Sequence, residues 1–357
     1  MRRHGWLGIL ILAASACGSP AAPTTTPSAS APASAAVVVP STSAEPSSPS
    51  IATPSAPPAV LDGEAWLVLQ TMSAAGYGVH FVRPDGTGLH RWSAAVPGTH
   101  EHPDWSPDGQ RILLNSVAED GTEDLWVGGV DGSDAHVLLE CAAPCIWVDE
   151  AAWSPDGTQV AFQRLVGDGT GSFTSTLELL DVATGATSVV LTMPTQEVVL
   201  QPRWSPDGDR IVVEALHLVA DDVDADVDVG SVGVVDLGDP EAGVVRIAEG
   251  FANSPDWSSD GGLVLWSQPG ASGGSDLWVA APDGTDARRV TDLAAKGGGA
   301  DQPAFTPDGQ AIVFVWSEPG QPGRVGRVGL DGSGLASAIG DLTLDAMHPR
   351  MRPAPTP

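Results

Sequence analysis

The chain has little positive charge. Its 357 residues include 16 Lys plus Arg against 45 Asp plus Glu, for a formal net charge of −29, and Lys296 is the only lysine. An acidic excess of this size disfavours nucleic acid and anionic lipid surfaces as direct partners, because both are polyanions. It is compatible with a cation, with a basic partner or simply with a soluble surface.

Long apolar runs are absent after the N-terminus. Residues 1–16 start with two arginines near the first position and contain the run WLGILILAA, which is too short to span a bilayer and is typical of an export signal. Small residues precede Cys17, so the segment resembles the lipobox of bacterial lipoproteins, and the resemblance implies lipidation of Cys17. Ordinary cleavage is the alternative. We expect an extracytoplasmic protein, periplasmic or at the cell surface, that meets the membrane only through a lipid anchor.

Charge is nearly absent from the next segment. Residues 18–60 contain ten prolines and a single charged residue, Glu45. Such a segment cannot bury enough apolar surface to offset the entropy lost on ordering. We therefore predict that residues 17–61 are a disordered tether rich in Pro, Ser and Ala.

Cysteine is scarce as well, with three residues in the chain. If Cys17 carries lipid, Cys141 and Cys145 in CAAPC are left as a pair. In an oxidising compartment we predict a structural disulfide between them, which would add about 2 kcal/mol of stability on the chain-entropy model. A redox motif would favour two intervening residues instead of three.

A five-residue motif recurs along the rest of the chain. WSPDG stands at 105–109, 153–157 and 204–208, with WSSDG at 257–261 and FTPDG at 305–309. Ser, Pro, Asp and Gly in this order favour a tight turn. The preceding aromatic residues are separated by 48, 51, 53 and 48 positions, and a period near fifty is that of a propeller blade of four short strands. These structural markers are Trp105, Trp153, Trp204, Trp257 and Phe305.

Six hairpin patterns alternate with these five turns. Each is a β-rich run, an Asp-Gly or similar turn and a second run, at 79–92, 124–138, 177–191, 232–247, 276–290 and 324–339. The missing sixth innermost strand is supplied by HPRM at 348–351, which repeats the start of HPDW at 102–105. We predict an all-β, six-bladed propeller in which this C-terminal strand joins three N-terminal strands to complete the first blade and close the ring.

The repeated P-x-W-S-P-D-G blade resembles that of TolB-like propellers over residues 62–353, with 354–357 as a tail. Prolyl-oligopeptidase-type peptidases share the repeat. Two local motifs suggest chemistry but have simpler explanations. GASGG at 270–274 has the form G-x-S-x-G, yet no helix pattern follows it, so a hairpin loop is favoured. The acidic run 221–230 does not fit a calcium loop, and we expect a solvated excursion of the fourth blade, with a looser calcium site as the alternative.

One position repeats just before the Pro of each innermost strand. In ring order it holds His348, His102, Glu150, Gln201, Ser254 and Gln302. We expect these residues at one mouth of the channel. His102, His348 and Glu150 lie on consecutive blades, with His100 nearby, and imidazoles with a carboxylate are ligands for zinc, manganese or iron. A divalent metal is therefore one interpretation, and a polar, water-filled mouth is the other.

Two positions further on, the ring reads Arg350, Asp104, Ala152, Arg203, Asp256 and Ala304. We interpret Arg350 with Asp104, and Arg203 with Asp256, as ion pairs between adjacent blades.

These observations favour a monomeric, non-catalytic binding scaffold over an enzyme. Its ligand would be an envelope protein, a glycan or a small molecule at the propeller face or channel mouth, presented by loops that differ between blades. The alternative is a metal-dependent lyase or hydrolase acting on an extracellular carbohydrate. Some pectin-fragment lyases have similar propellers, and that resemblance implies a histidine-bound metal in the channel.

Overall fold

The structure is a computed structural model. It describes residues 64–73, 76–92, 94–119, 121–169, 172–220, 226–271, 273–321, 323–340 and 345–353. The expected export signal, Cys17, the tether over 17–61 and the tail over 354–357 lie outside these residues.

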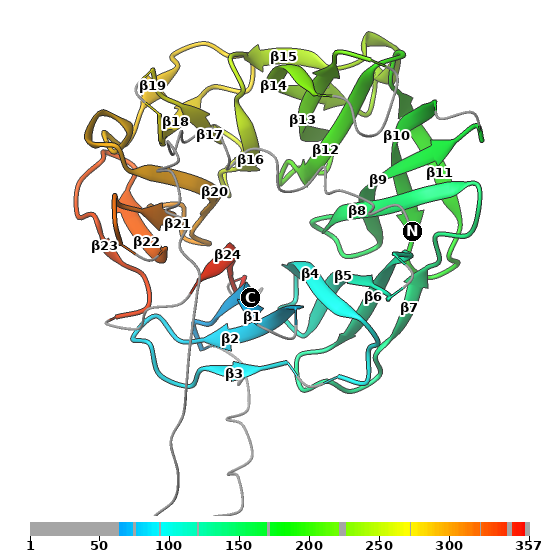
Figure 1. Ribbon diagram of the computed structural model, residues 1–357, viewed down its shortest axis with the longest axis horizontal. Coiled ribbons are helices and arrows are strands. Elements are labelled where there is room, and N and C mark those ends of the chain that lie inside the picture. Colours follow the sequence, from blue (N-terminus) through cyan, green and yellow to red (C-terminus); the bar gives the residue numbers. More distant parts are fainter. Residues whose placement is uncertain are drawn as a thin grey trace, which may run out of the picture.

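Six four-stranded antiparallel sheets are arranged as blades around a central channel (Figure 1). The predicted all-β, six-bladed propeller is confirmed. The first three blades, from the innermost strand outward, are β24 (Ala346–Met351), β1 (Leu67–Ser73), β2 (Gly76–Val82) and β3 (His90–Arg91); β4 (Thr99–Trp105), β5 (Arg111–Val117), β6 (Glu123–Gly129) and β7 (His136–Leu139); and β8 (Cys145–Trp153), β9 (Gln159–Gly167), β10 (Phe173–Asp181) and β11 (Thr187–Thr192).

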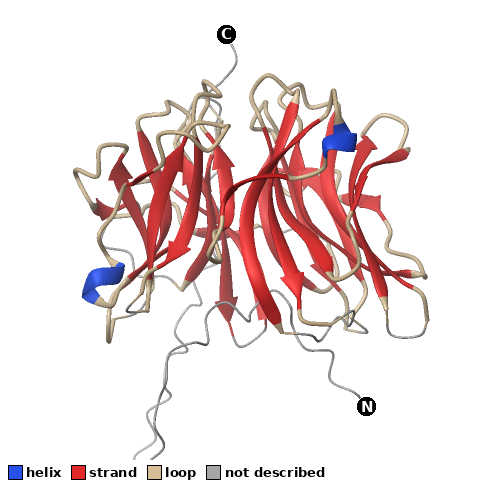
Figure 2. Ribbon diagram, turned by 90° about the horizontal axis from the view of Figure 1, so that it is seen from above, coloured by secondary structure: helices blue, strands red, loops and turns tan. Residues whose placement is uncertain are grey.

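The other three blades follow the same order. They are β12 (Glu197–Trp204), β13 (Arg210–Leu218), β14 (Val227–Asp236) and β15 (Val245–Ala248); β16 (Asn253–Trp257), β17 (Val264–Pro269), β18 (Ser275–Ala280) and β19 (Arg288–Arg289); and β20 (Gly299–Phe305), β21 (Ala311–Ser317), β22 (Arg324–Gly329) and β23 (Ala336–Ser337). The described helices are single 3-10 turns, η2 (Pro240–Ala242) and η3 (Ala294–Lys296), at the edges of the disc (Figure 2). Within the described ranges, no helix has the length and apolarity to cross a membrane.

The ring closes as predicted, because strand β24 pairs antiparallel with β1 from Leu67↔Met351 to Thr71↔Ala346. The indole N–H of Trp105 donates to the carbonyl of Arg350 at 3.1 Å, which ties the second blade to the closing strand. The closing strand therefore removes the free sheet edge that an open ring would leave at the first blade.

The repeated turn is held by its own polar side chains. In the first copy the Ser106 hydroxyl donates to Asp108 Oδ1 at 2.6 Å and accepts the N–H of Arg111 at 2.9 Å, and Gly109 has φ of 65°. The other four copies repeat the hydroxyl-to-Asp bond. A positive φ at this position favours glycine, which explains the invariance of the Gly within the five repeats.

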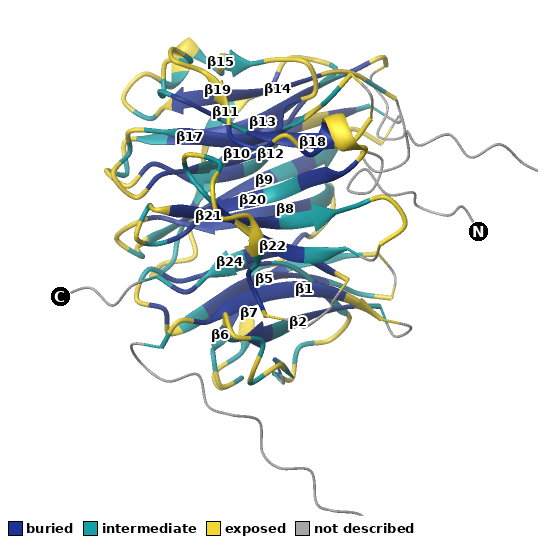
Figure 3. Cartoon of the chain, turned by 90° about the vertical axis from the view of Figure 1, so that its left-hand side faces the viewer, coloured by how far each residue is buried: buried dark blue, intermediate teal, exposed yellow. Residues whose placement is uncertain are grey.

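The five marker aromatics are buried, at 4 to 9% exposure, and pack between neighbouring blades. Trp105 contacts Phe81 of the first blade, with ring centroids 5.4 Å apart. Trp204 belongs to a cluster that includes Ala161 and Leu177 of the third blade, and Phe305 to one that includes Leu265 and Leu277 of the fifth. Figure 3 shows the result: buried residues run through the strands and exposed residues gather in the loops.

Three local features of the sequence have definite places in the fold. Cys141 and Cys145 form a disulfide just before and at the start of β8. GASGG joins β17 to β18 as a hairpin loop, with Ser272 outside the described residues. The acidic run joins β13 to β14 in the fourth blade; residues 221–225 are not described, and from Val227 the chain is already in β14.

Candidate functional site in the central channel

Each innermost strand carries a register shift at the same place, and a non-glycine residue with positive φ lies at each shift. These are the six residues of the predicted ring, with φ of 48° to 53°: His348, His102, Glu150, Gln201, Ser254 and Gln302. A left-handed conformation costs about 1 kcal/mol or more for such residues. A bulge re-aims side chains, and strained residues of this kind are common at functional sites.

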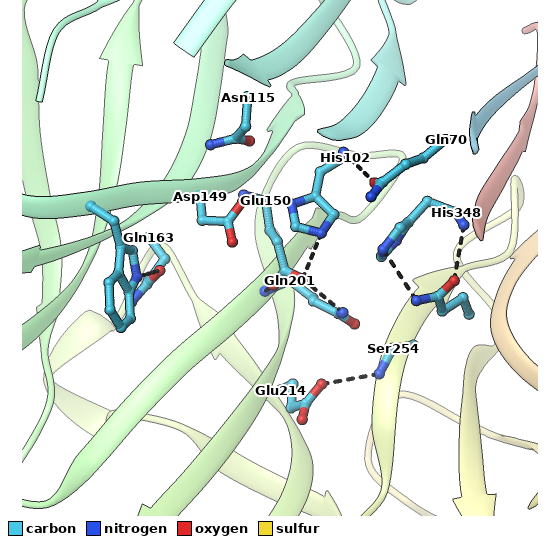
Figure 4. A network of polar contacts seen from close by, with 12 residues as sticks. Gln70, His102, Asn115, Asp149, Glu150, Gln163, Gln201, Glu214, Ser254 and His348 are labelled. Carbon is cyan, nitrogen blue, oxygen red and sulfur yellow. Dashed lines mark hydrogen bonds and ion pairs between the residues drawn. The ribbon is translucent and has the colours of Figure 1, made fainter. Parts of the chain in front are cut away.

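The bulge frees a backbone N–H, and in most blades a side-chain oxygen accepts it. The N–H of His102 donates to Gln70 Oε1 at 2.9 Å, that of Gln201 to Glu150 Oε2 at 2.8 Å, and that of His348 to Gln302 Oε1 at 3.0 Å. Glu214 Oε2 accepts the N–H of Ser254 at 3.3 Å. The channel layer is thus cross-linked from blade to blade (Figure 4).

A second set of polar residues was missed in the sequence. The strand next to the innermost one carries a buried polar side chain at the equivalent position in five blades, at 0 to 2% exposure: Gln70, Asn115, Gln163, Glu214 and Ser267. Each interrupts an apolar run, as in ILLN at 112–115 and IVVE at 211–214. The sequence does contain a signal for these residues, namely a polar residue inside an apolar run typical of a fully buried strand. Such a residue requires hydrogen-bond partners in the core.

His102 lies at the centre of the most polar part of the channel layer. Its Nδ1 is 2.6 Å from Asp149 Oδ1 and its Nε2 is 3.8 Å from Glu150 Oε1. The ring of His348 meets it edge to face at a centroid distance of 4.4 Å. Figure 4 shows these side chains converging from separate blades.

His348 is held by Gln302, whose amide Nε2 lies 3.1 Å from His348 Nε2. Since an amide nitrogen can only donate, His348 Nε2 accepts, and the neutral ring carries its proton on Nδ1. The two histidines therefore have different hydrogen-bonding roles.

Their protonation differs too. Burial alone would lower the pKa of His102, but the charges of Asp149 and Glu150 outweigh it and raise the pKa to about 10. For His348, burial and then the charges of His102 and Arg350 lower the pKa well below its usual range. At neutral pH the pair is one imidazolium beside one neutral imidazole.

Carboxyl groups surround this pair. Burial and the Asp149 charge raise the pKa of Glu123 to about 9, and burial and the Glu150 charge raise that of Glu214 to about 8. Burial also raises the pKa of Glu101 and Glu150. Because like charges and desolvation both oppose ionisation, this layer holds protons that a bound cation would replace.

Three of the side chains could hold a metal ion. Ligand atoms of His102, Asp149 and Glu150 all lie within 4.8 Å of one another. The structure therefore brings together two of the residues predicted from sequence and adds Asp149, which precedes Glu150 in the chain. His348 contacts the His102 ring but is not in this group. His100 faces elsewhere, with Nε2 3.1 Å from the carbonyl of Val96.

The two predicted ion pairs of the neighbouring ring are not those that form. Arg350 pairs with Asp256 at 3.6 Å, across the blade of Ala304, and no carboxylate of the described residues lies within 4.0 Å of Arg203. The reason is that each aspartate is held by the next blade. Asp256 Oδ2 accepts the N–H of Phe305 at 2.8 Å, and Asp104 Oδ2 that of Trp153 at 3.2 Å. Their carboxylates therefore point forward around the ring.

Fold and channel layer define a six-bladed propeller with a polar, acidic site on its axis. No family model matches the sequence, and a comparison with curated proteins finds no match. Among solved structures, TolB from Acinetobacter baumannii is similar at a TM-score of 0.61 and 16% identity, over 82% of this chain and 67% of that one. A TolB-type protein of Agrobacterium tumefaciens gives 0.54 and 21%, over 77% and 88%. The fold is thus that of the TolB-like propellers.

An oligogalacturonate lyase in complex with manganese is also similar, at a TM-score of 0.48 and 18% identity, over 77% of this chain and 73% of that one. Likeness at this level does not extend to that protein's chemistry.

Proposed function

We propose that this chain is an extracytoplasmic binding propeller that holds a divalent cation in its channel between His102 and Glu150, with Asp149 behind the imidazole. The observation that carries the proposal is the meeting of these three side chains, of which His102 and Glu150 stand at the bulge position that has a positive φ in every blade. The export signal expected over residues 1–16 supports an extracytoplasmic location of the protein. The net charge of −29 supports a positively charged ligand.

The donor set fits such an ion. Zinc lies about 2.0 to 2.2 Å from imidazole nitrogen and carboxylate oxygen, so one ion can bridge His102 Nε2 and Glu150 Oε1, which are 3.8 Å apart. Asp149 on the opposite ring nitrogen would orient the imidazole, as carboxylates commonly do behind a metal-bound histidine. Mixed nitrogen and oxygen donors suit zinc, manganese or iron.

The test is a calorimetric titration of Mn²⁺ and Zn²⁺ into chelator-treated protein. We expect one site in the wild type, and its loss in His102→Gln and in Glu150→Gln. His136→Gln serves as the matched control, since His136 is exposed and its Nδ1 donates to the carbonyl of Asp134 at 2.7 Å, within its own turn. Equal binding by all four proteins would refute the assignment. If no protein binds metal, crosslinking for an envelope protein or a glycan array becomes the relevant search.

A second candidate function is a metal-dependent lyase or hydrolase acting on an extracellular carbohydrate. One observation favours it: the depressed pKa of His348 leaves a neutral imidazole against His102, and its protonated Nδ1 would donate a hydrogen bond to a substrate oxygen beside the metal. Metal-loaded protein would then cleave polysaccharide fragments, with new reducing or unsaturated ends as the readout. His348→Ala should abolish cleavage and retain the metal; absence of cleavage in the wild type across acidic and neutral polysaccharides would leave the binding function alone.

A further inference from the structure

The ring of Arg and Asp next to the His102 layer has an internal two-fold pattern. From the first blade to the sixth it reads Arg350, Asp104, Ala152, Arg203, Asp256 and Ala304, which is Arg-Asp-Ala twice. Blades related by this pattern lie on opposite sides of the channel (Figure 1). Each half of the ring therefore has a guanidinium and a carboxylate separated by a blade whose residue at this position is alanine.

In one half the two charges meet. Asp256 is held by the N–H of Phe305 and so points toward the sixth blade. Ala304 of that blade has a short side chain, which leaves room for Arg350 of the first blade to reach Asp256. Arg350 Nη1 and Asp256 Oδ2 are 3.6 Å apart, and Arg350 Nη1 also donates to the carbonyl of Pro303 at 3.3 Å. In this half the guanidinium and the carboxylate therefore compensate each other's charge.

In the other half the equivalent pair is open. Asp104 is held by the N–H of Trp153 in the same way, and so points across Ala152 toward Arg203. Within the described part of the chain, however, Arg203 has no carboxylate within 4.0 Å. Its Nη1 donates to the carbonyl of the adjacent Pro202 at 3.0 Å, and its Nε, like that of Arg350, is buried without a hydrogen-bond partner among the described residues. Arg203 is half-buried, so its guanidinium stays within reach of a bound anion.

A cavity lies at this ring. It has a volume of about 110 Å³, and both members of the open pair line it, together with Arg350 and Asp256. The cavity thus presents one guanidinium and one carboxylate that have no ion-pair partner within 4.0 Å among the described residues, on walls otherwise formed by Trp105, Ala304, Phe305, Met351 and Pro353.

We propose that this cavity binds a small zwitterion of amino-acid size, with the ligand carboxylate on Arg203 and the ligand ammonium group on Asp104. The bound molecule completes the open half of the ring as Arg350 and Asp256 complete the closed one. A single anion would pair with Arg203 and leave Asp104 without an ion-pair partner, and a single cation would do the reverse. A bidentate guanidinium contact is well suited to a carboxylate.

This site is separate from the metal proposed at His102, and the experiment keeps the two apart. Glycine is titrated calorimetrically into chelator-treated protein, with acetate and methylammonium as probes that carry one charge each. We expect glycine to bind with a Kd between about 10 µM and 10 mM, a range suited to a ligand of few atoms. Acetate and methylammonium should each bind at least about tenfold more weakly.

Variants assign the binding to the open pair. Arg203→Gln and Asp104→Asn should each weaken glycine binding by at least about tenfold. Asp104→Asn keeps a side-chain oxygen to accept the N–H of Trp153. Arg327→Gln, a matched change at an exposed arginine, and His102→Gln, in the metal layer, should leave it unchanged. Melting temperatures within a few degrees of wild type show that the variants fold.

Each of the following results would overturn the proposal. They are no glycine binding by the wild type up to about 10 mM, acetate binding as tight as glycine binding, and glycine binding that survives both Arg203→Gln and Asp104→Asn. Loss of glycine binding in His102→Gln alone would place the ligand in the other layer and would overturn it as well.

Discussion

Replacing Glu214 by Gln should stabilise the protein at neutral and alkaline pH but not at acidic pH. Glu214 is 1% exposed, its Oε2 accepts the N–H of Ser254 at 3.3 Å, and its Oε1 is buried without a partner. Burial and the charge of Glu150 raise its pKa from 4.5 to about 8. The native state therefore holds this proton more tightly than the unfolded chain does.

The sign of the effect follows from that difference. Below the unfolded pKa both states are protonated, and the buried group carries no electrostatic penalty. As pH rises from 4.5 toward 8 the unfolded chain releases the proton first, so the wild type loses stability over this window. A shift of this size corresponds to about 5 kcal/mol at most, at about 1.4 kcal/mol for each pKa unit. Local relaxation and water entry reduce such penalties, so we expect Glu214→Gln to gain about 2 to 4 kcal/mol at pH values near 8.5.

The assay is urea unfolding of chelator-treated protein at about pH 4 and about pH 8.5. Gln keeps a carbonyl oxygen for the N–H of Ser254 and mimics the protonated acid. Near pH 4 the variant and the wild type should have the same free energy of unfolding. Glu241→Gln, at an exposed position in η2, is the control and should show no pH-dependent gain. Equal stability of Glu214→Gln and wild type at both pH values would refute the reasoning.

Two further predictions concern stability. Cys141→Ser/Cys145→Ser should lower the free energy of unfolding by about 2 kcal/mol under non-reducing conditions, because the disulfide closes a short loop; an unchanged unfolding midpoint would contradict this. Trp105→Phe should cost about 1 kcal/mol more than Trp153→Phe, because the Trp105 indole N–H donates to the carbonyl of Arg350 in the closing strand, whereas the Trp153 indole N–H has no acceptor among the described residues. Chemical unfolding of the two variants side by side measures the difference, and an equal loss would show that the indole bond contributes nothing.

The architecture was predictable because local side-chain and backbone contacts determine the repeated turns. Ser or Thr, Asp and Gly close each repeated turn through contacts within six residues, and the five copies set the blade period. The C-terminal strand could be assigned because HPRM repeats the pattern of another innermost strand. Closure by β24 then follows from the count of hairpins.

The channel site was predictable only in part. Ring position identified His102 and Glu150, but Asp149 reaches the imidazole because of a bulge with a left-handed residue, which no local sequence signal specifies. The ion pairs were wrong because the direction of each aspartate depends on a backbone N–H of the next blade. Asp256 therefore pairs forward with Arg350 and not with Arg203.

The cation site at His102 is the central claim, and anomalous diffraction from crystals soaked in Mn²⁺ tests it most directly. The account predicts one strong peak on the propeller axis, about 2.0 to 2.3 Å from His102 Nε2 and from a carboxylate oxygen of Glu150, absent in His102→Gln crystals. A channel without a peak, or a peak bound by other residues and unchanged in His102→Gln, would contradict it.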